Sequence, residues 1–426
     1  MNNWPPQDQV CWYLNKTLEL APICQENITA DVAIIGGGMA GLSAAQAWRK
    51  RGKKVVLLEQ YYCGSGASGK SSGFITPNAE LSFTDFANLY NFQSAHTMWD
   101  FFTSGVNDIR HNIQHHQLDC DYTAQDTLMV ANSPADFKKL ATEYTNLAQH
   151  GYKTALYTQD EMQRYIASKS YFGAVLYEDS FGINGYLYCQ EMKKVLQKAG
   201  VLIFENTPVV EINEHMLRTP HAQITAEYIV VCTDRFMPEL NLLPREVYHA
   251  QTFLMISEPL TDTQIRTIFP DKPFLAWDSD LIYTYFRMTS HRQLLVGGGS
   301  PFTAYDKQPR HHSNYMFKKL MGYVTRTFPH VNTRFTQLWP GLIGLSKDIA
   351  PLAGCDKDRP YMFYVSAAAG LPIAAALGRY SAENLLDKQS YLDAYFSPYR
   401  QFLIGGLLQT VLGTKLSFAL SNVIRR

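Results

Sequence analysis

The sequence lacks several features that would point to specialised classes of protein. Its seven cysteines are scattered and form no CxxC pair, which favours a reducing compartment. Lysine plus arginine equal aspartate plus glutamate at 38 each, so no net field attracts a polyanion and we expect no nucleic-acid partner. The opening stretch 1–6 has neither the positive start nor the apolar run of a secretory signal. We therefore expect a cytoplasmic protein.

The composition is that of a large folded protein. The chain has 426 residues, of which 46% are hydrophobic and 13% aromatic, enough for two domains with full cores. It has no internal repeat of fixed period and no low-complexity linker, so the two domains should pack tightly and share a site.

A glycine-rich turn near the start carries most of the functional information. The stretch 31–42 predicts a buried strand, glycines spaced GxGxxG (Gly36, Gly38 and Gly41), and then a helix. In such a turn the first glycine bends the chain, the second lets the backbone approach a pyrophosphate, and the third lets helix and strand pack closely. A second strand, Lys54–Glu59, ends on an acid 18 residues after Gly41, where ribose hydroxyls need an acceptor. The pattern predicts a dinucleotide site.

The loop 61–75 indicates which dinucleotide is bound. It is built of small residues that leave amides and hydroxyls available to a long cofactor, and a nicotinamide enzyme has no obvious use for it. At this point the chain resembles the D-amino-acid oxidase (DAO) superfamily of flavoproteins, closest to its gamma-glutamylputrescine oxidase and glycine oxidase branch. In that family a similar loop, commonly with arginine where Lys70 stands, runs beneath the flavin.

The resemblance extends over about nine-tenths of the chain and implies non-covalently bound FAD. Further similar segments are 118–122, 207–212, 229–233, 283–287, 293–299, 339–344, 348–351 and the stretch to Gly378. The position that some relatives use for a covalent flavin link falls near Trp339. The implied cofactor-binding residues are Gly36, Gly38, Met39, Ala40, Gly41, Glu59, Gln60, Ser68, Lys70, Ser71, Ser72, Gly73, Val209, Cys232, Gly341, Gly370, Leu371, Pro372 and Ile373.

A helix predicted over 373–386 begins with Pro372 in its first turn, where a missing N–H costs nothing. Its amino end should face something negative. In the family this is the pyrimidine side of the flavin, reached by a Gly-His-Gly turn that reads Ala368-Ala369-Gly370 here, which puts the reduction potential in doubt. The alternative is an ordinary buried helix end.

The order of elements predicts an α/β fold, a Rossmann-like FAD-binding domain with an inserted antiparallel-sheet substrate domain. The FAD-binding domain is expected to comprise 1–95, 180–235 and 336–392, the substrate domain 96–179 and 236–335, and an amphipathic tail 393–426.

Arg287 is the best candidate to anchor the charged end of a substrate. It lies on a predicted strand and faces the same way as Tyr283 and Tyr285, so the three are expected to form one catalytic wall. The alternative is that Arg287 is solvated and the tyrosines belong to the core. Some relatives place a lysine that promotes reaction with oxygen on the strand 294–296, which here reads Leu-Leu-Val, so oxygen and a quinone or other carrier both stay open as electron acceptors.

Two other patterns have plainer interpretations. His111, His115 and His116 fall on a predicted helix without an HExxH glutamate, so we expect a solvated helix face and no metal site. The triplet 297–299 is followed by Pro301 and a polar stretch where a helix should start, so a turn ending a hairpin is expected there rather than a second nucleotide loop.

The tail 399–426 carries apolar residues at helical spacing, and its only charged residues are positive. Such a stripe packs against the chain's own surface or a second subunit, or it lies peripherally on an anionic membrane. It is too interrupted by polar residues for a confident membrane span.

These observations predict an FAD-dependent oxidoreductase that oxidises a small amine or amino acid at its C–N bond by hydride transfer, as oxidase or dehydrogenase. Two alternatives stay open. One is an FAD-dependent 2-hydroxy-acid dehydrogenase on the same scaffold, and the other is a non-catalytic flavin-fold protein that binds or assembles partners.

Overall fold

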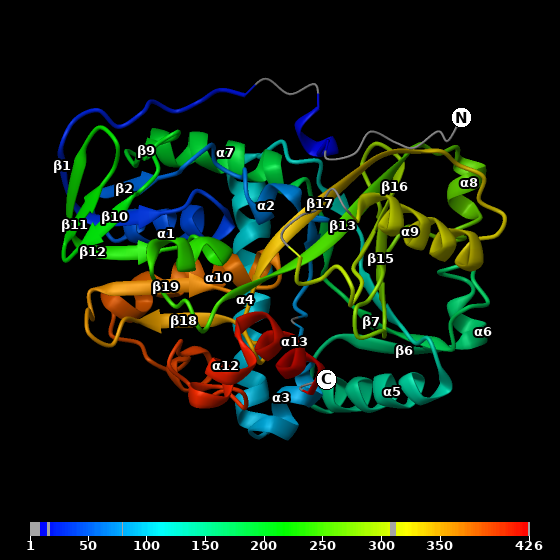
Figure 1. The fold of residues 1–426 in the computed structure, drawn as a ribbon. Helices are drawn as coiled ribbons and strands as arrows, with labels where there is room; N and C mark the ends of the chain where they lie inside the picture. The colour runs from blue at the N-terminus through cyan, green and yellow to red at the C-terminus, as the bar shows by residue number, and fades with distance from the viewer. Residues whose placement is uncertain (1–8, 15–17, 79, 307–311, 425–426) are drawn as a thin grey trace.

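The computed structural model describes residues 9–14, 18–78, 80–306 and 312–424. Two large sheets lie side by side, one at the left and one at the right of Figure 1, with the long helix α4 between them. The α/β fold class, with a nucleotide-binding-type sheet and a second sheet, is confirmed.

The first sheet forms because its central strands are almost wholly apolar and buried on both faces, as expected of parallel strands covered by helices. Its order is β10-β11-β12-β1-β2-β9, and β19 pairs with β12 and with β18. The pairs β12–β1, β1–β2, β2–β9 and β12–β19 are parallel. Its strands are β1 (Ile28–Ile35), β2 (Val55–Leu58), β9 (Leu202–Phe204), β10 (Glu211–Asn213), β11 (Met216–Arg218), β12 (Gln223–Val231), β18 (Leu352–Cys355) and β19 (Met362–Ser366).

The second sheet has the order β17-β13-β16-β15-β14-β5-β7-β6, and every neighbouring pair is antiparallel except β14 with β5. A third, small sheet has the order β3-β8-β4. The strands of these two sheets are β3 (Phe74–Ile75), β4 (Thr123–Ala124), β5 (Thr127–Val130), β6 (Thr154–Thr158), β7 (Gly173–Tyr177), β8 (Phe181–Gly182), β13 (Tyr248–Pro259), β14 (Leu275–Asp278), β15 (Tyr285–Met288), β16 (Gln293–Gly298) and β17 (Phe335–Leu345).

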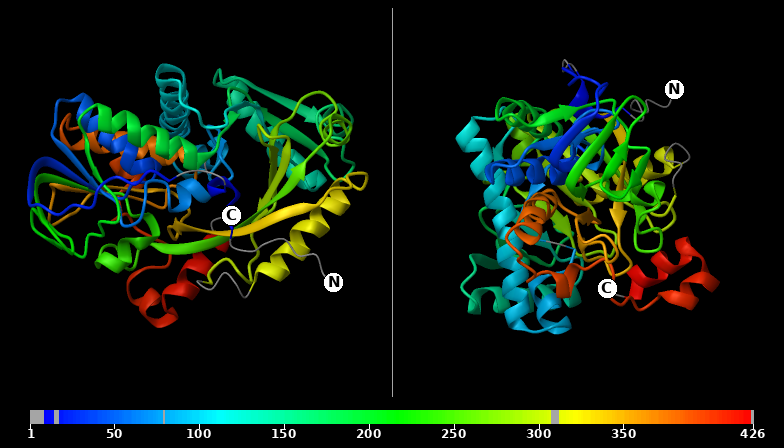
Figure 2. Two further views of the ribbon diagram at one scale, coloured as in Figure 1. Left: turned by 90° about the horizontal axis from the view of Figure 1, so that it is seen from above. Right: turned by 90° about the vertical axis from the view of Figure 1, so that its left-hand side faces the viewer.

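Helices cover the first sheet, and α9 packs along the second (Figure 2). The tail forms two short helices, α12 and α13, that project from the body. The helices are α1 (Met39–Lys50), α2 (Ala67–Lys70), α3 (Phe83–Leu89), α4 (Phe92–His116), α5 (Pro134–Gln149), α6 (Gln159–Met162), α7 (Gly185–Lys198), α8 (Asp262–Arg266), α9 (Ser313–Thr327), α10 (Leu371–Leu385), α11 (Asp393–Phe396), α12 (Gly406–Leu412) and α13 (Thr414–Ile424), with 3₁₀ turns η1 (Cys11–Tyr13) and η2 (Asp234–Leu240).

Strand β17 pairs with β13 in the second sheet, whereas the sequence places residues from 336 onward in the FAD-binding domain. Two sequence expectations need correction at this level. Tyr283 precedes β15 instead of lying on it. The triplet 297–299 does not form a turn throughout, because β16 runs to Gly298. The domain limits themselves stay a prediction.

Candidate functional site

The glycine turn is forced by close backbone contacts. Gly36 joins β1 to α1 with φ +106°, and a Cβ there would lie 2.5 Å from the Cys232 carbonyl oxygen. A Cβ on Gly41 would lie 1.9 Å from the Gly36 oxygen. Gly38 differs, because a Cβ there would meet only the Ser68 hydroxyl, at 3.1 Å, and this residue faces a cavity. The turn therefore presents bare backbone and the first amides of α1 to that cavity.

The cavity lies between the two large sheets and has a volume of about 1780 Å³. It exceeds the roughly 300–1,000 Å³ of typical small-ligand pockets, so a dinucleotide and a substrate fit the space together. Gly41 and Ile373 are not among its lining residues and belong to the packing behind it. The predicted cofactor residues that line it are Gly36, Gly38, Met39, Ala40, Glu59, Gln60, Ser68, Lys70, Ser71, Ser72, Gly73, Val209, Cys232, Gly341, Gly370, Leu371 and Pro372.

Glu59 lies directly after β2 and is fixed by the protein. Its Oε2 accepts from the Gly37 amide at 2.7 Å and its Oε1 from the Tyr61 amide at 3.0 Å. Burial raises the pKa of this carboxyl, and the two amide hydrogen bonds act against that shift. The Ser65 hydroxyl also donates to Oε1, at 3.3 Å. Because a carboxylate has about four acceptor positions, Glu59 keeps about one for a ribose hydroxyl.

Three side chains from distant segments hold the backbone of the loop 70–72. Trp339 Nε1 donates to the Lys70 carbonyl at 3.1 Å, Trp12 Nε1 to the Ser71 carbonyl at 2.9 Å, and Arg287 Nε to the Ser72 carbonyl at 2.6 Å. We call these three donors the loop clamp. Because three successive carbonyls are engaged by the clamp, the orientation of the loop toward the cavity is fixed.

The clamp corrects the expectation for Arg287. Its side chain is only 1% exposed, does not line the cavity, and also donates to the carbonyls of Ile183 at 2.7 Å and Met288 at 3.2 Å. Burial lowers the pKa of this guanidinium to about 10. Arg287 therefore lies behind the loop 70–73, and its guanidinium donates to backbone carbonyls instead of forming part of the cavity wall.

Tyr283 and Tyr285 do come together on the cavity wall, with ring centroids 5.8 Å apart. Tyr283 donates its hydroxyl proton to Glu80 Oε1 at 2.8 Å, and burial raises the pKa of Tyr285 to about 12. Asp278 and Asp280 line the same end of the cavity. Burial, followed by the charge of Asp280, raises the pKa of Asp278 to about 6.

The amino end of α10 also opens onto the cavity. Gly370 precedes the helix with φ +121°, and Pro372 stands in the first turn, as predicted. Two nearby buried hydroxyls that line the cavity, Ser366 Oγ and Thr233 Oγ1, have no hydrogen-bond partner within the part of the chain that the structure describes. Buried polar atoms of this kind normally have a partner, which here a ligand can supply.

Two cations also face the cavity. Burial lowers the pKa of Lys70, and the charge of Arg235 acts in the same direction. Burial lowers the pKa of Arg235 as well, and its guanidinium stacks 3.8 Å from the ring centroid of Phe236. Desolvated cations that share a cavity favour an anionic occupant.

Sequence reasoning missed Trp12, Ser366, Thr233, Arg235 and Asp278. Ser366 is the last residue of the buried strand β19, and Thr233 follows β12. Residues at the carboxyl ends of such strands commonly contact ligands, so that signal was available. For Trp12 no local signal exists, because its acceptor lies 59 residues away in the sequence.

His111, His115 and His116 all lie on α4. The rings of His111 and His115 stack on α4 with centroids 5.3 Å apart. Among the residues that the structure describes, no group of three or more His, Cys, Asp or Glu side chains is arranged to hold a metal ion.

Together these features fit FAD. The glycine turn offers amides to a pyrophosphate, and Glu59 offers an acceptor to a ribose. The clamped loop and the amino end of α10 offer polar groups to the rest of the cofactor. The unpartnered hydroxyls and the two cations are the polar groups that such a molecule would satisfy.

Comparisons with known proteins agree with this geometry. The DAO family, described as FAD dependent oxidoreductase, matches residues 31–384. The chain is 24% identical to a probable oxidoreductase, OrdL, of Haemophilus influenzae, covering 98% of this chain and 97% of that protein. It is 27% identical to the gamma-glutamylputrescine oxidoreductase of Escherichia coli, covering 87% of each.

Solved structures share the fold. Glycine oxidase from Geobacillus kaustophilus superposes with a TM-score of 0.75 at 18% identity, covering 88% of this chain and 100% of that one. L-proline dehydrogenase from P. horikoshii gives a TM-score of 0.73 at 18% identity, covering 88% and 98%. The match to the family spans most of the sequence, and the structure supplies the matching fold and cavity. The chain belongs to the DAO family of FAD-dependent oxidoreductases.

Proposed function

We propose that the protein oxidises a small amine or amino acid at its C–N bond, giving an imine that water hydrolyses. Bound FAD supplies the acceptor for the hydride that leaves the carbon next to nitrogen. The relative from Escherichia coli is named for an amine, gamma-glutamylputrescine, which agrees with the proposal.

The observation that carries the proposal is the charge at the substrate end of the cavity. Asp278, Asp280 and Glu80 line it beside the two tyrosines, whereas Arg287 is held by backbone carbonyls. Carboxylates and aromatic faces favour a cationic ammonium group, which an amine or amino acid carries and a 2-hydroxy acid lacks. This end of the cavity therefore supports the amine over the hydroxy-acid alternative.

Most of the predicted residues have a role in the proposal. The turn formed by Gly38, Met39 and Ala40 contacts the pyrophosphate, and Glu59 accepts from a ribose hydroxyl. The flavin is contacted by Ser68–Gly73 and Gly370–Pro372. Tyr283 and Tyr285 orient the substrate and exclude water, and Asp278 attracts its charged nitrogen. Arg287 becomes a positioning residue that acts through the loop.

Purified protein tests the proposal directly. A yellow preparation should bleach anaerobically with an amine or amino acid. Bleaching only with a 2-hydroxy acid would establish the rival dehydrogenase, and a bound flavin that no donor reduces would favour a binding or assembly role.

The same sample separates the two acceptors. Stoichiometric peroxide on readmission of air indicates an oxidase. Slow reoxidation by air with fast reoxidation by a soluble quinone indicates a dehydrogenase. On β16, residues 294–296 are buried leucines and a valine, so they place no cation there to assist oxygen.

A further inference from the structure

The tail helices α12 and α13 are amphipathic in the reverse sense to ordinary surface helices. Their buried side chains include four polar ones, Gln409, Ser417, Ser421 and Asn422. Their exposed side chains are largely apolar, as are those just before α12. We call six of these the hairpin patch, each more than half exposed: Leu403, Leu407, Leu408, Val411, Val423 and Ile424. A helix in water normally buries its apolar side, so this patch is built to meet something other than water.

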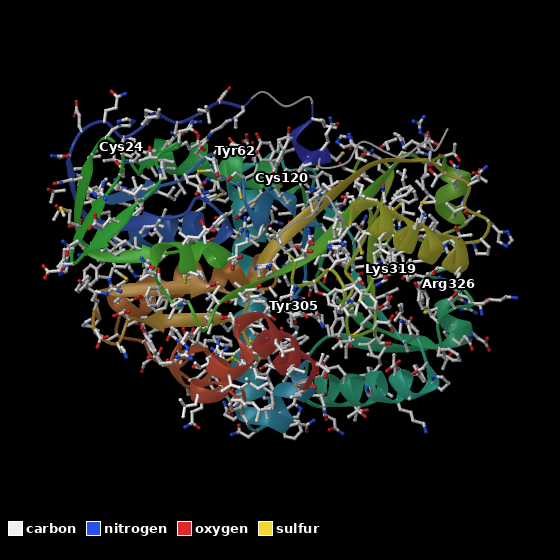
Figure 3. The ribbon with its side chains drawn as sticks, in the orientation of Figure 1. Cys24, Tyr62, Cys120, Tyr305, Lys319 and Arg326 are labelled. Carbon is white, nitrogen blue, oxygen red and sulfur yellow. The ribbon has the colours of Figure 1, made fainter. Side chains whose placement is uncertain are left out.

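Hydrogen bonds on the buried side fix the hairpin in this orientation. Lys347 Nζ donates to Gln409 Oε1 at 2.8 Å, and Gln409 Nε2 donates to the Arg245 carbonyl at 2.9 Å. Asn422 Nδ2 donates to the Lys347 carbonyl at 2.9 Å and accepts at Oδ1 from the hydroxyl of Tyr305, labelled in Figure 3, at 2.7 Å. Turning the apolar side inward would break these bonds, so the patch is a stable property of the surface.

The shape and charge of the hairpin favour a lipid bilayer. The two helices meet at a bend of 116° after Gly413 and project from the body as a convex corner (Figure 2). No single described helix is long and apolar enough to cross a membrane, and only this bent pair passes that test by length and composition. The tail from 399 to 426 contains no acidic residue. Its basic residues are Lys415, Arg425 and Arg426, together with Arg400, whose charge is paired with Asp348 at 2.6 Å.

Lys415 is exposed on α13, and Arg245 reaches α12 by donating to the Gly406 carbonyl at 3.0 Å. A second copy of the chain docking on the same patch would bring these positive groups against one another, which is unfavourable. Anionic headgroups complement the positive charge, and acyl chains accept the leucines.

We propose that the hairpin of α12 and α13 seats the protein on an anionic membrane surface, with the hairpin patch inserted into one leaflet. The inner side of α13 lines the cavity through Ala419 and Asn422, so membrane binding would bring the cavity close to the lipid. If the proposed oxidation holds, this placement gives a lipid-soluble electron acceptor a short route to the flavin.

Co-sedimentation of the full, FAD-loaded chain with lipid vesicles tests membrane binding without any assay of turnover. The wild type should bind vesicles of mixed phosphatidylcholine and phosphatidylglycerol, more weakly at high salt, and should bind pure phosphatidylcholine poorly. Leu407→Glu combined with Val411→Glu should reduce binding by about tenfold or more, because two apolar contacts are lost and negative charge faces the lipid. The two side chains are 87% and 83% exposed, so the fold should tolerate both changes.

The matched control is Leu20→Glu combined with Ile23→Glu, which places the same two negative charges on exposed apolar residues of the amino-terminal segment. That segment lies on the opposite side of the molecule from the hairpin (Figure 1). The control should bind vesicles like the wild type. Wild-type protein that ignores anionic vesicles, or a hairpin double variant that binds them equally, would overturn the proposal. A dimer that dissociates in the hairpin double variant, without any vesicle binding, would assign the patch to a second copy instead. None of these outcomes depends on the substrate, so failure of the proposed oxidation is recognised separately by anaerobic bleaching.

Discussion

Asp278 is the residue whose ionisation should be visible in catalysis. Because its pKa is raised to about 6, the carboxyl is neutral below that pH and negative above it. We expect kcat/KM for an amine to rise with an inflection near pH 6 as the attraction for the ammonium group develops. Asp278→Asn should remove the inflection and lower kcat/KM by roughly tenfold, equivalent to about 1.4 kcal/mol. A variant with an unchanged pH profile would assign the inflection to another group.

The raised pKa of Asp278 also affects the stability of the fold, which should fall with rising pH while kcat/KM rises. A carboxyl whose pKa is higher in the folded chain than in the unfolded one binds its proton more tightly when folded. The contribution of Asp278 to the free energy of unfolding is therefore fully present below pH 3.8 and is lost as the pH rises through about 6.

Gly38 offers a residue-scale test of the cofactor site. Gly38→Val adds a side chain beside the Ser68 hydroxyl, on the cavity side of the turn, so the apoprotein should fold while the affinity for FAD falls by about tenfold or more. Fluorescence titration of apoprotein with FAD measures the change. Gly322→Ala on α9, outside the cavity lining, is the control and should titrate like the wild type. Equal affinities in all three proteins would show that the pyrophosphate does not lie at this turn.

At the scale of elements, the loop 70–72 owes its position to the clamp rather than to its own sequence. Trp12→Phe keeps an aromatic ring but removes the hydrogen bond to the Ser71 carbonyl, so it should cost about 1 kcal/mol of unfolding free energy and alter the visible spectrum of the bound flavin. Trp48→Phe is the matched control, because Trp48 Nε1 donates to Ser381 Oγ at 3.1 Å away from the loop. It should lose similar stability and leave the spectrum unchanged. A spectrum that also stays unchanged in Trp12→Phe would reduce the clamp to a structural contact.

Elements with strong local signals were predictable and those set by distant contacts were not. The predicted strand before Gly36, the strand ending at Glu59 and the helix after Pro372 correspond to β1, β2 and α10 because apolar runs, glycine and proline act locally. The alternation along β15 placed Arg287 on the same face as Tyr285. It gave no indication that the loop 70–72 would accept the hydrogen bond of its guanidinium. The apolar stripe of the tail predicted helices, whereas only the structure shows that the stripe faces outward.

At the scale of the whole molecule, a buried ion pair ties four segments together. Lys193 Nζ lies 3.1 Å from Glu205 Oε2, and the two side chains are 2% and 0% exposed. Glu205 also accepts from the amides of Ala21 and Cys63, and Lys193 donates to the Glu19 carbonyl. The pair thus links α7 and the end of β9 to the amino-terminal segment and to the loop after β2.

Removing one partner should therefore affect the whole fold. Lys193→Met leaves Glu205 buried without its counter-charge, so the free energy of unfolding should fall by about 3–5 kcal/mol in chemical denaturation. The neighbouring Lys194→Ala breaks only the exposed pair with Glu191 and should cost less than about 0.5 kcal/mol. A Lys193→Met protein as stable as the wild type would show that the pair contributes nothing beyond packing.

The span of the cofactor cavity along the chain also constrains biosynthesis. Its walls run from the turn at Gly36 to the tail helix α13, and the central strand β1 pairs with β12, nearly 200 positions downstream. Sequence-distant pairings form late, after a large loss of chain entropy. While the ribosome is still making the last quarter of the polypeptide, the nascent chain can hold only part of the vitamin-derived cofactor. Loading should thus follow release of the finished polypeptide, and cells short of riboflavin should accumulate an incompletely consolidated form that proteases remove first.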